Sequence, residues 1–252
     1  MKHALLIAPI ALFAASLASA DVTEEKHFSY TLETGGRISL ENVNGDITIT
    51  GGSGDTVEIT ALKKAGSQEY LDGIKINITA DADRIRVETK LPESSGWFNW
   101  GGDHTGSVTY TLSVPASANL DTIESVNGEI RLSGVLGTVR AETVNGGIDA
   151  SDLSGNVKLE TVNGGIDGTF AGLSGTQKVD CETVNGKINL RLPANAGAHV
   201  SAETVNGGID AGDFGLEANK GFVGRDLEGD IGDGSARVSL NTVNGAIRLR
   251  KD

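Results

Sequence analysis

Cysteine, proline and aromatic residues are all scarce in this sequence. It holds 1 Cys and 4 Pro, and aromatic residues make up 4% of it. A single cysteine excludes an internal disulfide even in an oxidising compartment. Cys181 alternates with acidic neighbours, which predicts a small buried apolar residue. So few large side chains are atypical of a conventional β-sandwich core, and thin layers of Ile, Val, Leu and Ala are expected instead.

Basic residues are outnumbered by acidic ones. The chain carries 21 Lys and Arg against 34 Asp and Glu, which gives a net charge of −13. A chain of this charge repels nucleic acid and anionic lipid. Cations, basic surfaces and neutral glycans remain as ligands, and we expect an envelope or extracellular glycan or protein as the partner.

The only long hydrophobic run lies at the start of the chain. Met1, Lys2 and His3 precede an apolar stretch, and Ala18-Ser19-Ala20 ends it with a small-x-small pattern. This order is typical of a secretory signal peptide cut after Ala20, and the apolar stretch is shorter than the ~20 residues that cross a bilayer. We therefore expect residues 1–20 to be removed and the mature chain, without a transmembrane segment, to be periplasmic, secreted or at the cell surface.

A tripeptide repeat dominates the rest of the sequence. Val-Asn-Gly begins at positions 43, 126, 144, 162, 184, 205 and 243. The later copies recur every 18–22 residues, except that the last interval is twice as long, and a degenerate copy, Leu227-Glu228-Gly229-Asp230-Ile231, divides it. Repeats of this length indicate stacked units. We therefore assign residues 121–252 to a repeat region of such units.

Apolar and polar residues alternate on both sides of each Asn-Gly, which predicts strands joined by a corner. Asn-Gly also favours the left-handed backbone angles of a tight turn. Two all-β folds fit: hairpins, for which Asn-Gly between strands is a strong signal, or a β-solenoid, in which each strand pairs with the next coil. We favour the β-solenoid, because stacking gives a reason for the same Glu, Thr, Val and Ile to recur in every copy.

Stacked coils of 18–22 residues predict ladders of equivalent side chains. An internal stack is expected from Ile130, Ile148, Ile166, Ile188, Ile209, Ile231 and Ile247. A corner ladder of hydrogen-bonded amides is expected from Asn127, Asn145, Asn163, Asn185, Asn206 and Asn244. Glu228 of the degenerate copy would interrupt this corner ladder.

A row of carboxylates is predicted on the outside of the stack. It comprises Glu41, Glu124, Glu142, Glu160, Glu182 and Glu203, followed by Arg225 and Asn241. Such a row is either a solvated edge or a strip that binds a basic surface or a divalent cation, since oxygen ligands suit Ca²⁺. The glycine–aspartate pattern is too sparse for the short calcium-binding β-roll repeat.

The N-terminal region, residues 21–120, repeats poorly. Residues 38–49 form one clear coil, and several alternating segments follow, which we expect to begin the solenoid or cap it. Both tryptophans lie between Gly and Ser in one loop. Trp97, Phe98 and Trp100 are candidates for an aromatic platform that binds a sugar ring or a protein, or for a cover over the end of the stack.

The signal peptide, the V-N-G-x-I repeats and the strand at residues 108–115 that precedes most of the repeats resemble the bacterial putative-adhesin family of β-strand-repeat envelope proteins. The resemblance covers most of residues 28–250. It implies a surface or envelope role in adhesion, scaffolding or envelope association, and it carries no catalytic residue over to this chain.

A β-helix enzyme acting on polysaccharide is the alternative function. The outward row after the Ile positions contains Arg131, Asp149, Asp167, Asn189 and Asp210. Paired carboxylates serve as acid and base in glycosidases. However, these are ordinary repeat positions, and the histidines are scattered with no nucleophile motif or ligand spacing. We therefore predict no catalytic residue, no metal site and no cofactor.

Overall fold

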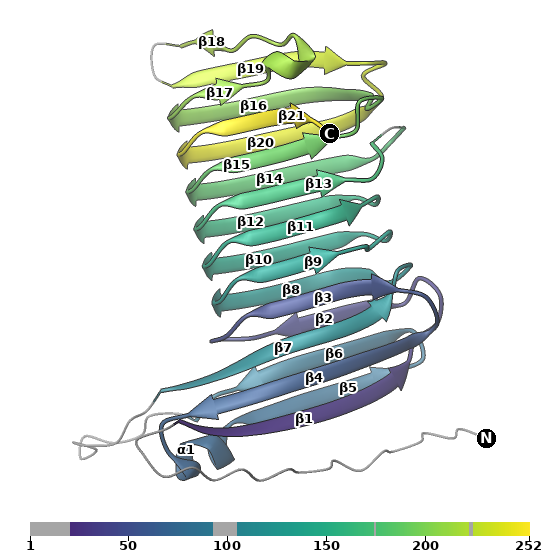
Figure 1. Ribbon diagram of the computed structural model, residues 1–252, viewed down its shortest axis with the longest axis vertical. Helices are drawn as coiled ribbons and strands as arrows, with labels where there is room; N and C mark the ends of the chain where they lie inside the picture. Colours follow the sequence, from purple (N-terminus) through teal and green to yellow (C-terminus); the bar gives the residue numbers. More distant parts are fainter. Residues whose placement is uncertain (1–20, 93–104, 174, 222–223) are drawn as a thin grey trace.

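The computed structural model describes residues 21–92, 105–173, 175–221 and 224–252. Nearly all of its regular structure is β, arranged in two long sheets that run side by side along one axis (Figure 1). The all-β class is therefore confirmed. The predicted signal peptide, residues 1–20, and the loop with Trp97, Phe98 and Trp100 lie outside the described residues.

The two sheets are called sheet A and sheet B. In spatial order, sheet A contains β1 (Val22–Thr31), β4 (Thr56–Ala65), β7 (Gly106–Pro115), β3 (Ile47–Gly52), β9 (Ile130–Ser133), β11 (Ile148–Leu153), β13 (Ile166–Phe170), β15 (Ile188–Leu192), β21 (Ile247–Lys251) and β17 (Ile209–Asp210). Sheet B contains β18 (Asn219–Lys220), β19 (Arg225–Ile231), β16 (Ala198–Asn206), β20 (Ala236–Asn244), β14 (Lys178–Asn185), β12 (Val157–Asn163), β10 (Val139–Asn145), β8 (Asn119–Asn127), β2 (Arg37–Glu41), β6 (Arg84–Lys90) and β5 (Lys75–Asp81).

Each Asn-Gly corner carries the chain from sheet B to sheet A. β12 pairs in parallel with β10 and β14, and Val157 lies opposite Val139 and Val179. β13 pairs in parallel with β11 and β15 in the other sheet. A hairpin would instead pair β12 with β13 in antiparallel fashion. The hairpin alternative is therefore wrong, and the chain is a β-solenoid with long parallel sheets.

The interior is a stack of aliphatic layers between the two sheets. Its isoleucine ladder runs in the spatial order Ile47, Ile130, Ile148, Ile166, Ile188, Ile247 and Ile209, and each of these side chains is buried. Burial of one such side chain contributes about 1.5–3 kcal/mol before entropy is counted. Cys181 is also fully buried, as predicted, and burial raises the pKa of its thiol.

The last coil does not lie at the end of the stack. β20 is inserted between β14 and β16, and β21 between β15 and β17 (Figure 1). The degenerate copy forms β19, which pairs in antiparallel fashion with β16. The expectation that it forms a coil, with Ile231 in the internal stack and Glu228 interrupting the corner ladder, is therefore wrong. It has no Asn-Gly corner, and together with β18 and η1 (Gly212–Phe214) it covers the end of the stack.

The glycine of each Val-Asn-Gly is required by close approach rather than by its backbone angles. Among these glycines only Gly45 has a positive φ, of 116°. A Cβ added at Gly164 would overlap the carbonyl oxygen of Gly146 in the neighbouring coil. The same overlap recurs at Gly128, Gly146, Gly186, Gly245 and Gly207. The left-handed corner inferred from sequence is thus wrong for most copies.

Two rows of side-chain hydrogen bonds lie beside these glycines. Buried Thr161 donates to the carbonyl oxygen of Gly146 at 2.9 Å, and Thr183 donates to that of Gly164 at 2.9 Å. The asparagine amides donate to one another along the corner, at 2.8–2.9 Å, in the order Asn206, Asn244, Asn185, Asn163, Asn145, Asn127 and Asn44. The ladder therefore gains Asn44 and follows the spatial order of the coils rather than their order in the sequence.

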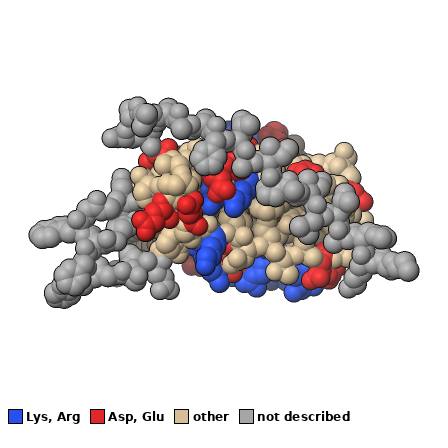
Figure 2. Space-filling view, turned by 90° about the horizontal axis from the view of Figure 1, so that it is seen from below, with Lys and Arg blue, Asp and Glu red and all other residues tan. Residues whose placement is uncertain are grey.

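The N-terminal strands widen the stack at its other end. The coil of β2 and β3 stacks on β8 and β9, while β1, β4 and β7 pair in antiparallel fashion beyond it, as do β5 and β6. A short helix, α1 (Gln68–Gly73), lies at this end. Basic and acidic side chains are interspersed there (Figure 2), and the Lys63 ammonium, 3% exposed, lies 2.6 Å from the Glu24 carboxylate. Charges on edge strands oppose pairing with another sheet.

We predict that Gly164→Ala destabilises the fold far more than Gly165→Ala. The added methyl group at Gly164 meets a neighbouring carbonyl oxygen, whereas at Gly165 its nearest neighbour, the Lys187 carbonyl oxygen, is 3.3 Å away. Overpacking of this kind costs about 1–3 kcal/mol, which lowers Tm by several degrees in a chain of this size. Thermal melting of the two variants measures the difference. Equal Tm values would contradict the close approach of the coils.

Candidate binding groove

A nearly continuous row of carboxylates follows the outer face of sheet B. Register pairing gives the spatial order Glu88, Glu41, Glu124, Glu142, Glu160, Glu182, Asn241, Glu203 and Asp226. The structure therefore brings together the predicted glutamates, but Asn241 separates Glu182 from Glu203 because β20 is inserted there. Arg225 lies opposite Thr204 rather than in the row, so its predicted place is wrong.

A row of exposed valines accompanies the carboxylates. In six of the seven Val-Asn-Gly copies the Val points outward and is 40–46% exposed, namely at Val126, Val144, Val162, Val184, Val243 and Val205. Sequence reasoning missed this row, although a signal was present. Residues two apart on a strand share a face, so an outward Glu160 implies an inward Thr161 and an outward Val162.

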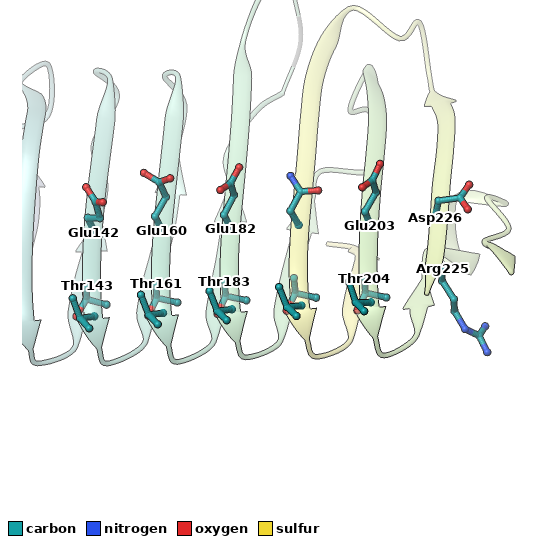
Figure 3. A pocket seen from close by; sticks show the side chains of 17 residues that line it. Glu142, Thr143, Glu160, Thr161, Glu182, Thr183, Glu203, Thr204, Arg225 and Asp226 are labelled. Atoms are coloured by element: carbon teal, nitrogen blue, oxygen red, sulfur yellow. The ribbon is translucent and has the colours of Figure 1, made fainter. Parts of the chain in front are cut away.

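Between these rows lies an open groove of about 640 Å³, which we call the sheet B groove. Its walls come from β10, β12, β14, β20 and β16, each of which contributes its Glu or Asn, its Thr and its Val (Figure 3). Arg225 and Asp226 of β19 close one end. The groove runs along the axis of the solenoid, across the strands, and successive strands are ~4.8 Å apart.

Neighbouring cations neutralise only part of the carboxylate row. Lys158 lies 3.0 Å from Glu160, and Arg86 lies 2.5 Å from Glu41. By contrast, no Lys, Arg or His among the described residues lies within 4.0 Å of Glu182 or Glu203. The carboxylates without a nearby cation are therefore in the half of the groove that ends at β19.

Like charges act on one another along the row. The pKa of Glu124 is raised, chiefly by burial and then by the neighbouring carboxylates of Glu142 and Glu41. The hydrogen bond with Glu160 raises the pKa of Lys158. The negative charge of Glu124 is thus disfavoured by its own neighbours in the row.

The arrangement of the carboxylates suits a long contact surface better than a metal cage. Each strand supplies one carboxylate, and no group of three or more His, Cys, Asp or Glu in the described parts of the chain is placed to hold a metal ion.

On the outer face of sheet A, Arg131, Asp149, Asp167 and Asn189 occupy one row, as the sequence predicted, and Arg248 stands between Asn189 and Asp210.

The sequence model of a family described as Toastrack DUF4097 matches residues 36–250. The chain belongs to the Toastrack DUF4097 family. The match spans the N-terminal strands from β2 onward and the repeat coils, and β1 precedes it. No curated protein is a match to the chain. Within the described residues, no helix is both long enough and apolar enough to span a membrane.

Solved structures resemble this Toastrack chain over most of its length. A "putative cell adhesion protein" from Clostridium sporogenes shares 18% identity, with 90% of this chain and 100% of that one aligned and a TM-score of 0.46. A "putative adhesin" from Bacteroides fragilis shares 13% identity, with 89% and 96% aligned and a TM-score of 0.44. Both are described as adhesion proteins and neither as an enzyme.

We predict that Glu182→Gln leaves the fold as stable as before or more stable at low salt. The substitution removes a carboxylate that faces Glu160 and has no cation within 4.0 Å among the described residues. Like charges on opposing strands cost up to about 1 kcal/mol, and salt screens them. Glu160→Gln is the matched control, because it loses the contact with Lys158. Melting at low and high salt checks this, and a large loss of Tm in Glu182→Gln alone would contradict it.

Proposed function

We propose that this chain is an exported, non-catalytic β-solenoid that acts in adhesion or scaffolding at the cell envelope, and that the sheet B groove binds a basic partner protein there. The observation that carries the proposal is the presence, on one face, of an exposed valine row beside a carboxylate row in which Glu182 and Glu203 have no cation within 4.0 Å among the described residues. Contiguous exposed apolar side chains on a soluble protein mark contact sites, and complementary charge selects the partner.

The groove also suits an extended chain as its occupant. A partner lying along the solenoid axis meets a Val at each coil and, at all but one, a Glu. Lysine and arginine side chains of that partner would reach the carboxylates, while its apolar side chains would cover the valines. A repeated surface of this kind accepts many registers, which is a property expected of an adhesive or scaffolding contact rather than of a site for one small molecule.

A soluble peptide of alternating lysine and valine is the probe that tests this proposal. We expect it to bind the mature chain and to bind Glu182→Gln/Glu203→Gln about 2- to 30-fold more weakly, because each exposed ion pair contributes about 0.2–1 kcal/mol. The matched control is Glu33→Gln/Glu217→Gln, which changes net charge equally at exposed positions outside the groove. Isothermal titration calorimetry measures the affinities.

Two results of that titration would overturn the proposal. One is the absence of binding to the unaltered chain. The other is an equal loss of affinity in the groove variant and in the control, which would mean that the peptide responds only to net charge. Val184→Thr separately tests the apolar row, because it keeps the shape of the side chain, and we expect it to weaken binding as well.

Affinity for the same peptide is expected to fall in mildly acidic solution. Glu124 extends the carboxylate row one strand beyond Glu142, at the edge of the sheet B groove. Its pKa is raised by burial and by two neighbouring carboxylates, so protonation removes its charge at a higher pH than for an ordinary glutamate. Titrations at several pH values check this. In Glu124→Gln we expect weaker binding at neutral pH and a smaller further loss on acidification. An identical pH profile in both proteins would contradict the assignment.

A further inference from the structure

The outer face of sheet A, on the other side of the core from the sheet B groove, carries a trough of different chemistry. Its volume is about 690 Å³, and it crosses β9, β11, β13, β15 and β21. Short polar side chains line its middle, namely Ser133, Ser151, Thr169, Asp149, Asp167 and Asn189. Long arginines stand at its two ends, Arg131 on β9 and Arg191, Arg248 and Arg250 on β15 and β21. We call this hollow the sheet A trough.

Two of the four arginines, Arg191 and Arg248, have no ion-pair partner among the described residues. Arg131 lies 3.5 Å from Asp46, and Arg250 lies 2.5 Å from Asp210. No Asp or Glu in the described parts of the chain lies within 4.0 Å of the Arg191 or Arg248 guanidinium. Asp210, which faces Arg248 in the register, is already hydrogen-bonded to Arg250. Arg191 and Arg248 lie on adjacent strands, diagonal to one another in the register, so one end of the trough holds two guanidiniums without a carboxylate within 4.0 Å among the described residues.

The middle of the trough presents hydrogen-bonding groups of both kinds. The carboxylates of Asp149 and Asp167 accept hydrogen bonds, and the hydroxyls of Ser133, Ser151 and Thr169 donate and accept. The Asn189 amide donates to Asp167 at 2.8 Å, which orients both side chains. Sugar hydroxyls are donors and acceptors at once, so a row of this composition complements a carbohydrate.

The two halves of the trough together define the class of ligand. We propose that the sheet A trough binds an oligosaccharide that carries an acidic sugar, with the sugar carboxylate held by Arg191 and Arg248 and the neutral sugars hydrogen-bonded by Asp149, Asp167 and Asn189. Guanidinium groups bind carboxylates in bidentate fashion. Asp149 and Asp167 repel a uniformly charged polyanion, so the negative charge of the ligand lies at the arginine end. The ligand is thus a mostly neutral glycan with a localised acid.

The proposal goes beyond the role of the sheet B groove and concerns a separate face. A chain that holds a basic protein on one face and an acidic glycan on the other would bridge the two. The two faces share no lining residue, so variants of one leave the other intact, and each proposal can fail without the other.

Calorimetric titration with a xylo-oligosaccharide that bears a single glucuronic acid tests the inference. The neutral xylo-oligosaccharide of equal length, an oligogalacturonate and inorganic phosphate serve as comparison ligands. We expect the singly acidic sugar to bind most tightly, and Arg191→Gln/Arg248→Gln to weaken it about 2- to 30-fold, because each exposed ion pair contributes about 0.2–1 kcal/mol. The neutral sugar is expected to bind that variant as it binds the unaltered chain. Asp167→Asn, which alters the middle of the trough, is expected to weaken both sugars.

The matched control is Arg84→Gln/Arg237→Gln, which removes the same charge from exposed positions of sheet B. We expect it to leave sugar binding unchanged, and equal Tm values show that both double variants are folded. An equal loss in this control would overturn the proposal, because it would show a general response to charge. The proposal would also be overturned if oligogalacturonate or phosphate bound most tightly, or if the singly acidic sugar did not bind.

Discussion

Neighbouring coils approach one another at the Asn-Gly corner so closely that a side chain would not fit between them. The glycine of one coil lies against the carbonyl oxygen of the glycine in the next. This contact fixes the register of the coils, because a shift by one residue would bring a Cβ into the gap and turn inward side chains outward. At the same corner, the buried threonine hydroxyls and the asparagine amides form hydrogen bonds between neighbouring coils. The isoleucine ladder follows from the same register.

The outer surfaces result from this register as well. An inward Thr161 places Glu160 and Val162 outward together, so a repeat that builds the core also builds an acidic and apolar face. That face is uniform along sheet B. On sheet A the outward positions vary from coil to coil, from Asp149 to Asn189 to Arg248. The uniform face suits an extended partner, and the varied one suits a specific ligand.

The sequence carries enough information to predict the coils but not their order. Alternation around Asn-Gly identifies the strands, and their 18–22-residue spacing identifies the stacked units. The insertion of β20 between β14 and β16 was missed because coils with equivalent residues can stack in any order. Glu88 joins the carboxylate row from β6, in a region where no repeat marks it. Arg191 and Arg248 come to lie on adjacent strands, diagonal to one another in the register, through the same insertion, so their proximity had no signal in the sequence.

Cysteine cross-linking between β15 and its neighbour tests this account most directly. Asn189 faces Arg248 across β15 and β21, whereas Asp210 lies one strand further away, at ~9.6 Å. A disulfide needs Cα atoms within about 7 Å, and the native Cys181 is buried and unreactive. Under mild oxidation we expect Asn189→Cys/Arg248→Cys to cross-link and Asn189→Cys/Asp210→Cys not to, as read by mass spectrometry. The reverse result would contradict the in-register stacking of the last coil.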